Sequence, residues 1–150
     1  MTEYMDGAVI PTGFDEAVGP LMQATHYAGD EGSSLADARR FADVFLTRLR
    51  QEWCVELDPR TAGDVLLVVT ELITNADRHS SGPYVLELEG TSRQIAVTVY
   101  DSSAAVPVRF PRDPARVGGH GLEIVDALAV VSVEQVPVGK RVRAVLTLAS

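Results

Sequence analysis

The stretch from Pro59 to His79 limits the folds open to this chain more than any other segment. Asp58 and Pro59 supply an N-cap acceptor and then a proline, whose missing amide proton is not needed in the first helical turn. The apolar residues that follow recur at helical spacing on one side: Ala62, Val65, Leu66, Val69, Leu72, Ile73 and Ala76. A one-sided helix of this kind needs a partner for its apolar side, so the sequence predicts a layered domain.

The rest of the chain supplies a second long helix and several strands. Apolar residues at helical spacing predict a helix over residues 35–50, and Ser34 with Asp37 resembles a capping box at its start. The remaining patterns predict strands over residues 21–27, 84–89, 95–100, 130–136 and 141–148, and a short helix over 121–129. This order favours an α/β two-layer sandwich, a mixed and mostly antiparallel sheet with helices on one face. We expect residues 1–20 to be a tail or a loosely attached edge and residues 21–150 to form a single domain.

Composition excludes several classes of partner. The chain carries a formal net charge of −8, which repels nucleic acid and anionic membranes. No run reaches the ~18 apolar residues of a membrane-spanning helix, and the acidic first residues lack the basic region of a signal peptide. Cys54 is the only cysteine, so no intrachain disulfide forms, and we expect a small buried thiol beside Trp53. These features predict a cytoplasmic protein that binds neither nucleic acid nor membrane directly.

Polar residues recur every four positions along the helix expected from Pro59 to His79. Glu71, Asn75 and His79 lie on the side away from its apolar stripe. A solvated face explains this spacing, and so does a binding site. In a site, the carboxamide oxygen of Asn75 would suit Mg²⁺, which prefers oxygen ligands, and Glu71 could orient or deprotonate a nucleophile. The spacing alone leaves both interpretations open.

Two further segments carry polar or glycine-rich features. Asp101 follows an apolar strand, and it is either a turn former or, in a cleft, an acceptor for an exocyclic amine such as that of adenine. Another helix start is rich in glycine, with the run Gly118-Gly119-His120-Gly121-Leu122. Backbone amides and the helix dipole favour an anion there. The run has neither the Gly-Lys-Ser/Thr ending of a P-loop nor the glycine spacing of a dinucleotide fingerprint.

Taken in order, the three segments resemble the motifs of the GHKL ATPases, the superfamily of gyrase, the heat-shock ATPase, histidine kinases and MutL. The N-box is matched by VVTELITNADRHS, the aspartate box by VTVYDSS, and the second glycine box by GGHGLEIVDALA. The form of the N-box, the very short lid and the glycine-box run are similar to those of the anti-sigma regulatory factor serine/threonine kinases. The Ala38-Arg39 pair, Trp53 and the Gly139-Lys140 turn are also typical of that branch. The resemblance covers about residues 33–148.

The resemblance implies a Bergerat α/β sandwich that binds ATP with Mg²⁺. By this resemblance Glu71 is the catalytic base, Asn75 coordinates Mg²⁺, and Asp101 recognises the adenine amino group. A flexible lid is expected over residues 104–118. It contains three arginines that could meet phosphates or stay solvated: Arg109, Arg112 and Arg116.

The glycine-rich helix start has a role in the same scheme. The resemblance implies that Gly119 and Gly121 shape the hinge of the lid and leave backbone amides for the phosphates. His120 and Leu122 belong to the same nucleotide-binding segment.

The sequence departs from the family pattern at several positions. Ser103 stands two residues after Asp101, where glycine is frequent, which restricts the loop beneath adenine. Arg141 follows Lys140, where threonine is common, and Asp77 adds an acid beside the metal-binding turn. The tryptophan usual near the terminal hairpin is absent.

Two functions are consistent with the resemblance. In the first, an anti-sigma-factor-like regulator binds a sigma factor and phosphorylates a serine of a STAS-type anti-anti-sigma antagonist. In the second, the chain is a nucleotide-gated protein-binding module without phosphotransfer activity. Glu71 favours the kinase, because a module that only binds does not need a base there. Both functions involve ATP, Mg²⁺ and protein partners, and both allow a homodimer.

Overall fold

The computed structural model describes residues 19–28, 35–79, 83–102, 121–137 and 139–148. Along the chain the elements are β2 (Met22–Ala28), α1 (Leu35–Trp53), α2 (Pro59–His79), β3 (Tyr84–Gly90), β4 (Gln94–Asp101), α3 (Gly121–Leu128), β5 (Val130–Val136) and β6 (Gly139–Thr147). Each helix and strand expected from the sequence is present. The largest difference at a boundary is the end of α1, at Trp53 rather than Arg50. None of the described helices combines the length and the apolar character needed to cross a membrane.

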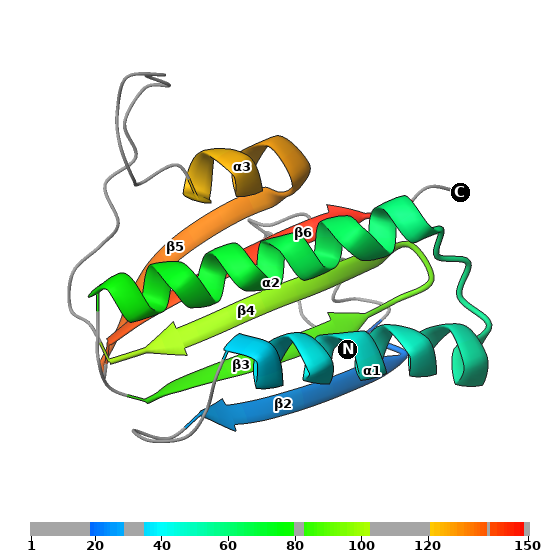
Figure 1. Ribbon diagram of the computed structural model, residues 1–150, viewed down its shortest axis with the longest axis horizontal. Helices are drawn as coiled ribbons and strands as arrows, with labels where there is room; N and C mark the ends of the chain where they lie inside the picture. Colours follow the sequence, from blue (N-terminus) through cyan, green and yellow to red (C-terminus); the bar gives the residue numbers. More distant parts are fainter. Residues whose placement is uncertain (1–18, 29–34, 80–82, 103–120, 138, 149–150) are drawn as a thin grey trace.

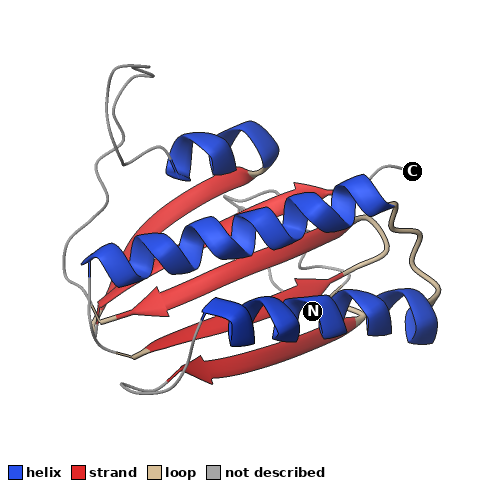
Figure 2. Ribbon diagram, in the orientation of Figure 1, coloured by secondary structure: helices blue, strands red, loops and turns tan. Residues whose placement is uncertain are grey.

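The strands form one sheet in the order β2-β3-β4-β6-β5, and each described pair is antiparallel. The described helices cover one face of this sheet, with α1 over β2 and β3, α2 over β4 and β6, and α3 beside α2 (Figures 1 and 2). The predicted two-layer sandwich is therefore confirmed. The prediction allowed for parallel pairs, but β6 lies between β4 and β5, so these two strands of equal direction are not neighbours.

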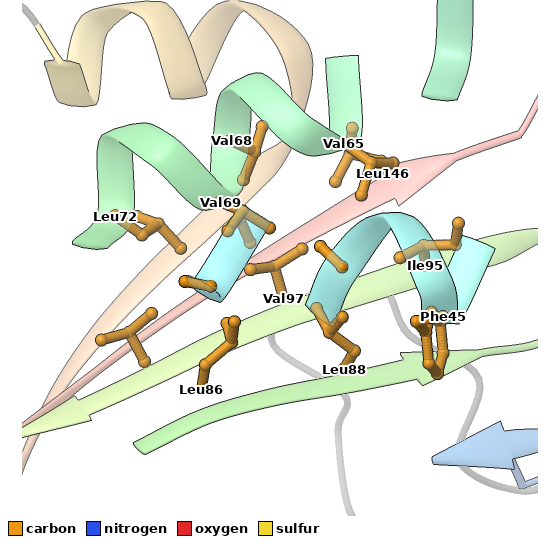
Figure 3. Close-up of a cluster of buried hydrophobic side chains, with 14 of the residues drawn as sticks. Phe45, Val65, Val68, Val69, Leu72, Leu86, Leu88, Ile95, Val97 and Leu146 are labelled. Carbon is orange, nitrogen blue, oxygen red and sulfur yellow. The ribbon is translucent and has the colours of Figure 1, made fainter. Parts of the chain in front are cut away.

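The hydrophobic core fills the space between the helices and the sheet. Figure 3 shows Phe45 of α1 and Val69 of α2 facing strand residues such as Leu88 and Val97. The apolar stripe expected on α2 is its covered side: Val65, Val69, Leu72, Ile73 and Ala76 are buried, and Ala62 and Leu66 pack partly against the core. Burial alternates along β3, as expected for a strand with one face on a core.

The start of α2 is capped as the sequence predicts. The Thr61 amide donates a hydrogen bond to Asp58 Oδ1 at 2.7 Å, and the Ala62 amide donates to the Asp58 carbonyl oxygen at 3.0 Å. The backbone hydrogen bond from Thr61 is the main reason that the pKa of Asp58 lies below its ordinary value. The carboxylate therefore stabilises the helix start more than the protonated acid does.

We expect Asp58→Ala to lower the stability of the protein in a pH-dependent way. Because the folded-state pKa of Asp58 is depressed, its contribution is present above the ordinary value of about 4 and is lost as pH falls through the folded value. Urea unfolding of the wild type and the variant should therefore differ at pH 7 and converge at low pH. Asp58→Asn retains an N-cap acceptor and serves as the control. An equal deficit of Asp58→Ala at both pH values would contradict this role.

The prediction that Cys54 is buried beside Trp53 is wrong. Both side chains are exposed. Cys54 adopts a positive φ of 55° directly after α1, and the next amide, of Val55, donates to the Leu49 carbonyl at 3.3 Å. This left-handed residue ends the helix and turns the chain. Val55, rather than Cys54, then enters the core.

The sheet face opposite the described helices carries a buried cation. Arg143 Nη1 of β6 lies 3.0 Å from Glu89 Oε1 and donates to Thr98 Oγ1 at 3.3 Å. Next to this group, the paired residues Ala96 and Val145 are also buried. Arg143 thus has partners from both β3 and β4, the two strands that precede β6 in the sheet.

Candidate functional site

Three polar side chains lie in a row at one end of the helix-covered face. Residue alternation in β4 places Asp101 on the same face as Val97 and Val99, and alternation in β6 places Lys140 with Val142. The strand register then pairs Tyr84 with Asp101, and Asp101 with Lys140. Tyr84, Asp101 and Lys140 are all buried. The core-facing rows of three neighbouring strands therefore end in hydroxyl, carboxylate and ammonium groups.

Asp101 and Lys140 form an ion pair inside the domain. Lys140 Nζ lies 3.4 Å from Asp101 Oδ2, and the two side chains are 0% and 2% exposed. Gly139 allows this approach of the strands. A Cβ atom at that position would lie 1.9 Å from the Asp101 carbonyl oxygen, and Gly139 has a φ of 153°, which side-chain-bearing residues rarely adopt. A glycine is therefore required where β6 begins beside the end of β4.

Tyr84 adds a neutral hydrogen-bond donor to the row. Burial raises the pKa of Tyr84 above its ordinary value, and the negative charges of Asp77 and Asp37 raise it further. Its hydroxyl therefore stays protonated at neutral pH, and it has no hydrogen-bond partner among the described residues. The effect of Asp77 agrees with Figure 1, in which the C-terminal end of α2 lies over the strand ends that carry this row, at the left of the picture.

Glu71 and Asn75 come from the last turns of α2. Both side chains are half-buried, at the margin of the apolar stripe rather than on a fully solvated face. Asn75 Nδ2 is buried and has no hydrogen-bond partner within the described residues. Glu71 makes no hydrogen bond or ion pair with another described residue. A solvated face therefore does not account for Asn75, whose amide donor is removed from water without an acceptor among the described residues.

The structure describes the glycine-rich segment only from Gly121 onward. Gly121 is the first residue of α3, as expected, and α3 packs against α2. The structure places the backbone of Gly121 and Leu122 but does not describe the Leu122 side chain. The other predicted parts lie outside the described residues: Gly119, His120, Ser103, the lid over residues 104–118 and its three arginines.

The residues present fit a nucleotide that carries Mg²⁺. The buried amide donor of Asn75 and the buried ammonium of Lys140 both lack a hydrogen-bond acceptor among the described residues. Buried donors without acceptors cost free energy, so they mark places where a ligand can supply oxygen or nitrogen atoms. Phosphate oxygens and a heterocyclic base supply such atoms, and the carboxamide oxygen of Asn75 is a suitable Mg²⁺ ligand.

Lys140 and Tyr84 were not among the residues expected in a site. The sequence does carry a signal for Lys140, because Val142, Ala144, Leu146 and Leu148 alternate along the last strand and so share one of its faces. Counting back by two places Lys140 on that face. The sequence pattern predicts a strand that begins only at Arg141, with Lys140 in the turn, whereas β6 begins at Gly139.

Comparison with known families agrees with the fold. A sequence model of the family described as histidine kinase-like ATPase domain matches residues 31–146. No curated protein matches the chain. Domains of this family bind ATP, usually with Mg²⁺, and the family includes anti-sigma regulatory kinases. Since the match spans most of the chain and both layers of the sandwich, the chain belongs to the histidine kinase-like ATPase family of the GHKL superfamily.

Proposed function

We propose that the chain is an anti-sigma-factor-like protein serine kinase. It binds ATP with Mg²⁺, transfers the γ-phosphoryl group to a serine of a STAS-type anti-anti-sigma antagonist, and binds a sigma factor. The observation that carries this proposal is the pair Glu71 and Asn75 in the last turns of α2. Both are half-buried, and neither has a hydrogen-bond partner among the described residues that accounts for it.

Each of the two residues has a distinct task in phosphoryl transfer. The Asn75 carboxamide would hold Mg²⁺ through its oxygen, and its buried Nδ2 would donate to a phosphate oxygen. Bound Mg²⁺ neutralises charge on the phosphates. Glu71, one helical turn earlier, would accept the proton of the attacking serine hydroxyl and orient it. The one-turn separation lets both side chains act from the same side of α2.

The adenine end of the site corresponds to Asp101. Its carboxylate would accept a hydrogen bond from the exocyclic amine of adenine. Gly121 at the start of α3, with Gly119, His120 and Leu122, would present backbone amides to the phosphates. In this arrangement ATP would lie between α2 and the ends of β4 and β6, with its adenine near Asp101 and its phosphates near the start of α3.

The test is phosphate transfer from radiolabelled ATP to a STAS-type protein. We expect labelled serine on that protein, with label absent when EDTA removes Mg²⁺. In calorimetry, Asn75→Ala should remove the effect of Mg²⁺ on ATP affinity, because it deletes the proposed protein ligand of the metal. Asp77→Asn, two residues further along α2 and exposed, should retain that effect.

Two negative results have different meanings. If the chain binds ATP but labels no serine-bearing partner, the kinase is refuted and the nucleotide-gated binding module takes its place. If calorimetry detects no adenine nucleotide at millimolar concentration with Mg²⁺, the proposed use of Asn75 and Asp101 is refuted as well.

A further inference from the structure

Lys140 is the only lysine in the chain, and it is completely buried. Its stem lies in the core-facing row of β6, and its ammonium group faces Asp101 on β4 at 3.4 Å. That distance is longer than a charge-assisted hydrogen bond, which is usually about 2.7–2.9 Å. Nζ has no hydrogen-bond partner among the described residues. This buried ammonium therefore has N–H donors for which the described residues offer no acceptor.

A buried charge of this kind is costly unless hydrogen bonds compensate for it. Asp101 offsets part of the cost through its opposite charge. The remaining donors need acceptors that the described residues do not supply. Arg143, in the same strand, shows the alternative, since its guanidinium contacts both Glu89 and Thr98 on the opposite face of the sheet. Lys140 differs from Arg143, because no described residue accepts a hydrogen bond from Nζ.

We propose that Lys140 and Asp101 together recognise the base of the bound nucleotide. Nζ donates a hydrogen bond to ring nitrogen N1 of adenine while the Asp101 carboxylate accepts one from the neighbouring 6-amino group. This inference rests on the proposed nucleotide binding and assigns a specificity-determining residue within it.

The chemistry of the base edge matches the order of the two side chains. Adenine presents a donor, the 6-amino group, beside an acceptor, N1. Asp101 and Lys140 present an acceptor beside a donor, on neighbouring strands whose register fixes their order. Guanine has the opposite order on this edge, with a carbonyl oxygen at position 6 and a protonated N1. It would place its carbonyl against the Asp101 carboxylate, so the pair selects adenine.

The test compares ATP with 1-deaza-ATP, in which a C–H group replaces N1. Calorimetry of the wild type should show roughly 10- to 100-fold weaker binding of 1-deaza-ATP, the usual effect of losing a hydrogen bond to a charged group. Lys140→Met should bind both ligands equally and at the weaker affinity. Arg143→Met is the matched control, because it removes a buried cation from the same strand on the other face, and it should keep the preference for ATP.

The ligand series decides the proposal even if Lys140→Met does not fold. Equal binding of ATP and 1-deaza-ATP by the wild type would refute the N1 contact and leave ATP binding intact. A preference for ATP that persists in folded Lys140→Met would also refute it. If the wild type binds neither ligand, the proposed nucleotide site itself fails. The double variant Lys140→Met/Asp101→Asn leaves no buried charge unpaired at this place, and the N1 preference should be absent from it as well.

Discussion

Replacing Glu71 with glutamine should slow phosphate transfer to the partner serine by roughly 10²–10⁴-fold, the usual effect of a positioned general base. Glutamine keeps the size of the side chain and its capacity for hydrogen bonds, but it cannot take a proton. Glu71 is half-buried and makes no hydrogen bond or ion pair with another described residue, so its carboxylate holds none of these residues in place. ATP affinity and stability should therefore change little.

Single-turnover transfer from radiolabelled ATP measures this effect without interference from product release. Asp64→Asn is the matched control, because Asp64 lies two turns earlier on the same side of α2 and is also half-buried. It removes the same charge from the helix and should leave transfer unchanged. Unchanged transfer in Glu71→Gln would show that Glu71 is not the base. A similar loss in both variants would indicate that the net charge of α2, rather than proton transfer, is responsible.

Gly139→Ala should lower the free energy of unfolding by roughly 3 kcal/mol or more, because the added atom meets backbone rather than a flexible side chain. The new Cβ would lie 1.9 Å from the Asp101 carbonyl oxygen and 2.9 Å from Ser102 Cα. The φ of 153° adds backbone strain for any residue other than glycine. Relief of the clash must move β6 away from β4, which also separates Lys140 from Asp101.

Urea denaturation compares this variant with Gly63→Ala. Gly63 lies inside α2, and a Cβ atom there meets nothing within 4 Å. Alanine should therefore stabilise the helix by about 0.5–1 kcal/mol. Opposite signs in the two variants would separate the effect of the strand contact from a general effect of replacing glycine. An unfolding midpoint of Gly139→Ala equal to that of the wild type would contradict the close contact.

The layers of this fold could be predicted because local patterns and tertiary packing agree. The capped start at Asp58 and the apolar stripe of α2 depend on neighbours along the chain, and the structure confirms both. The end of α1 could not be placed in the same way. Cys54 turns the chain in a left-handed conformation, and the sequence has no glycine there to indicate such a turn. Cys54 is exposed because the turn directs Val55, the next residue, into the core.

The candidate site could be predicted only in part, for a physical reason. Glu71 and Asn75 stand out because polar residues recur every four positions along α2, and Asp101 stands out because it ends an apolar strand. The structure places Asn75 and Asp101 where their polar groups are buried. Lys140 and Tyr84 join the site through the register of three strands. Register is a pairing between distant segments, and neither segment encodes it alone.

The burial of Lys140 gives the protein a chemical reporter at the site itself. Lys140 is the only residue with a side-chain amine, so acylation of a lysine can occur at one position only, and that position is closed to solvent in the folded state. Modification of Lys140 then requires a local opening of the fold around this residue. The rate of modification therefore reports how often this opening occurs. The rate of local opening at this site can thus be measured in the unaltered protein, without an introduced probe.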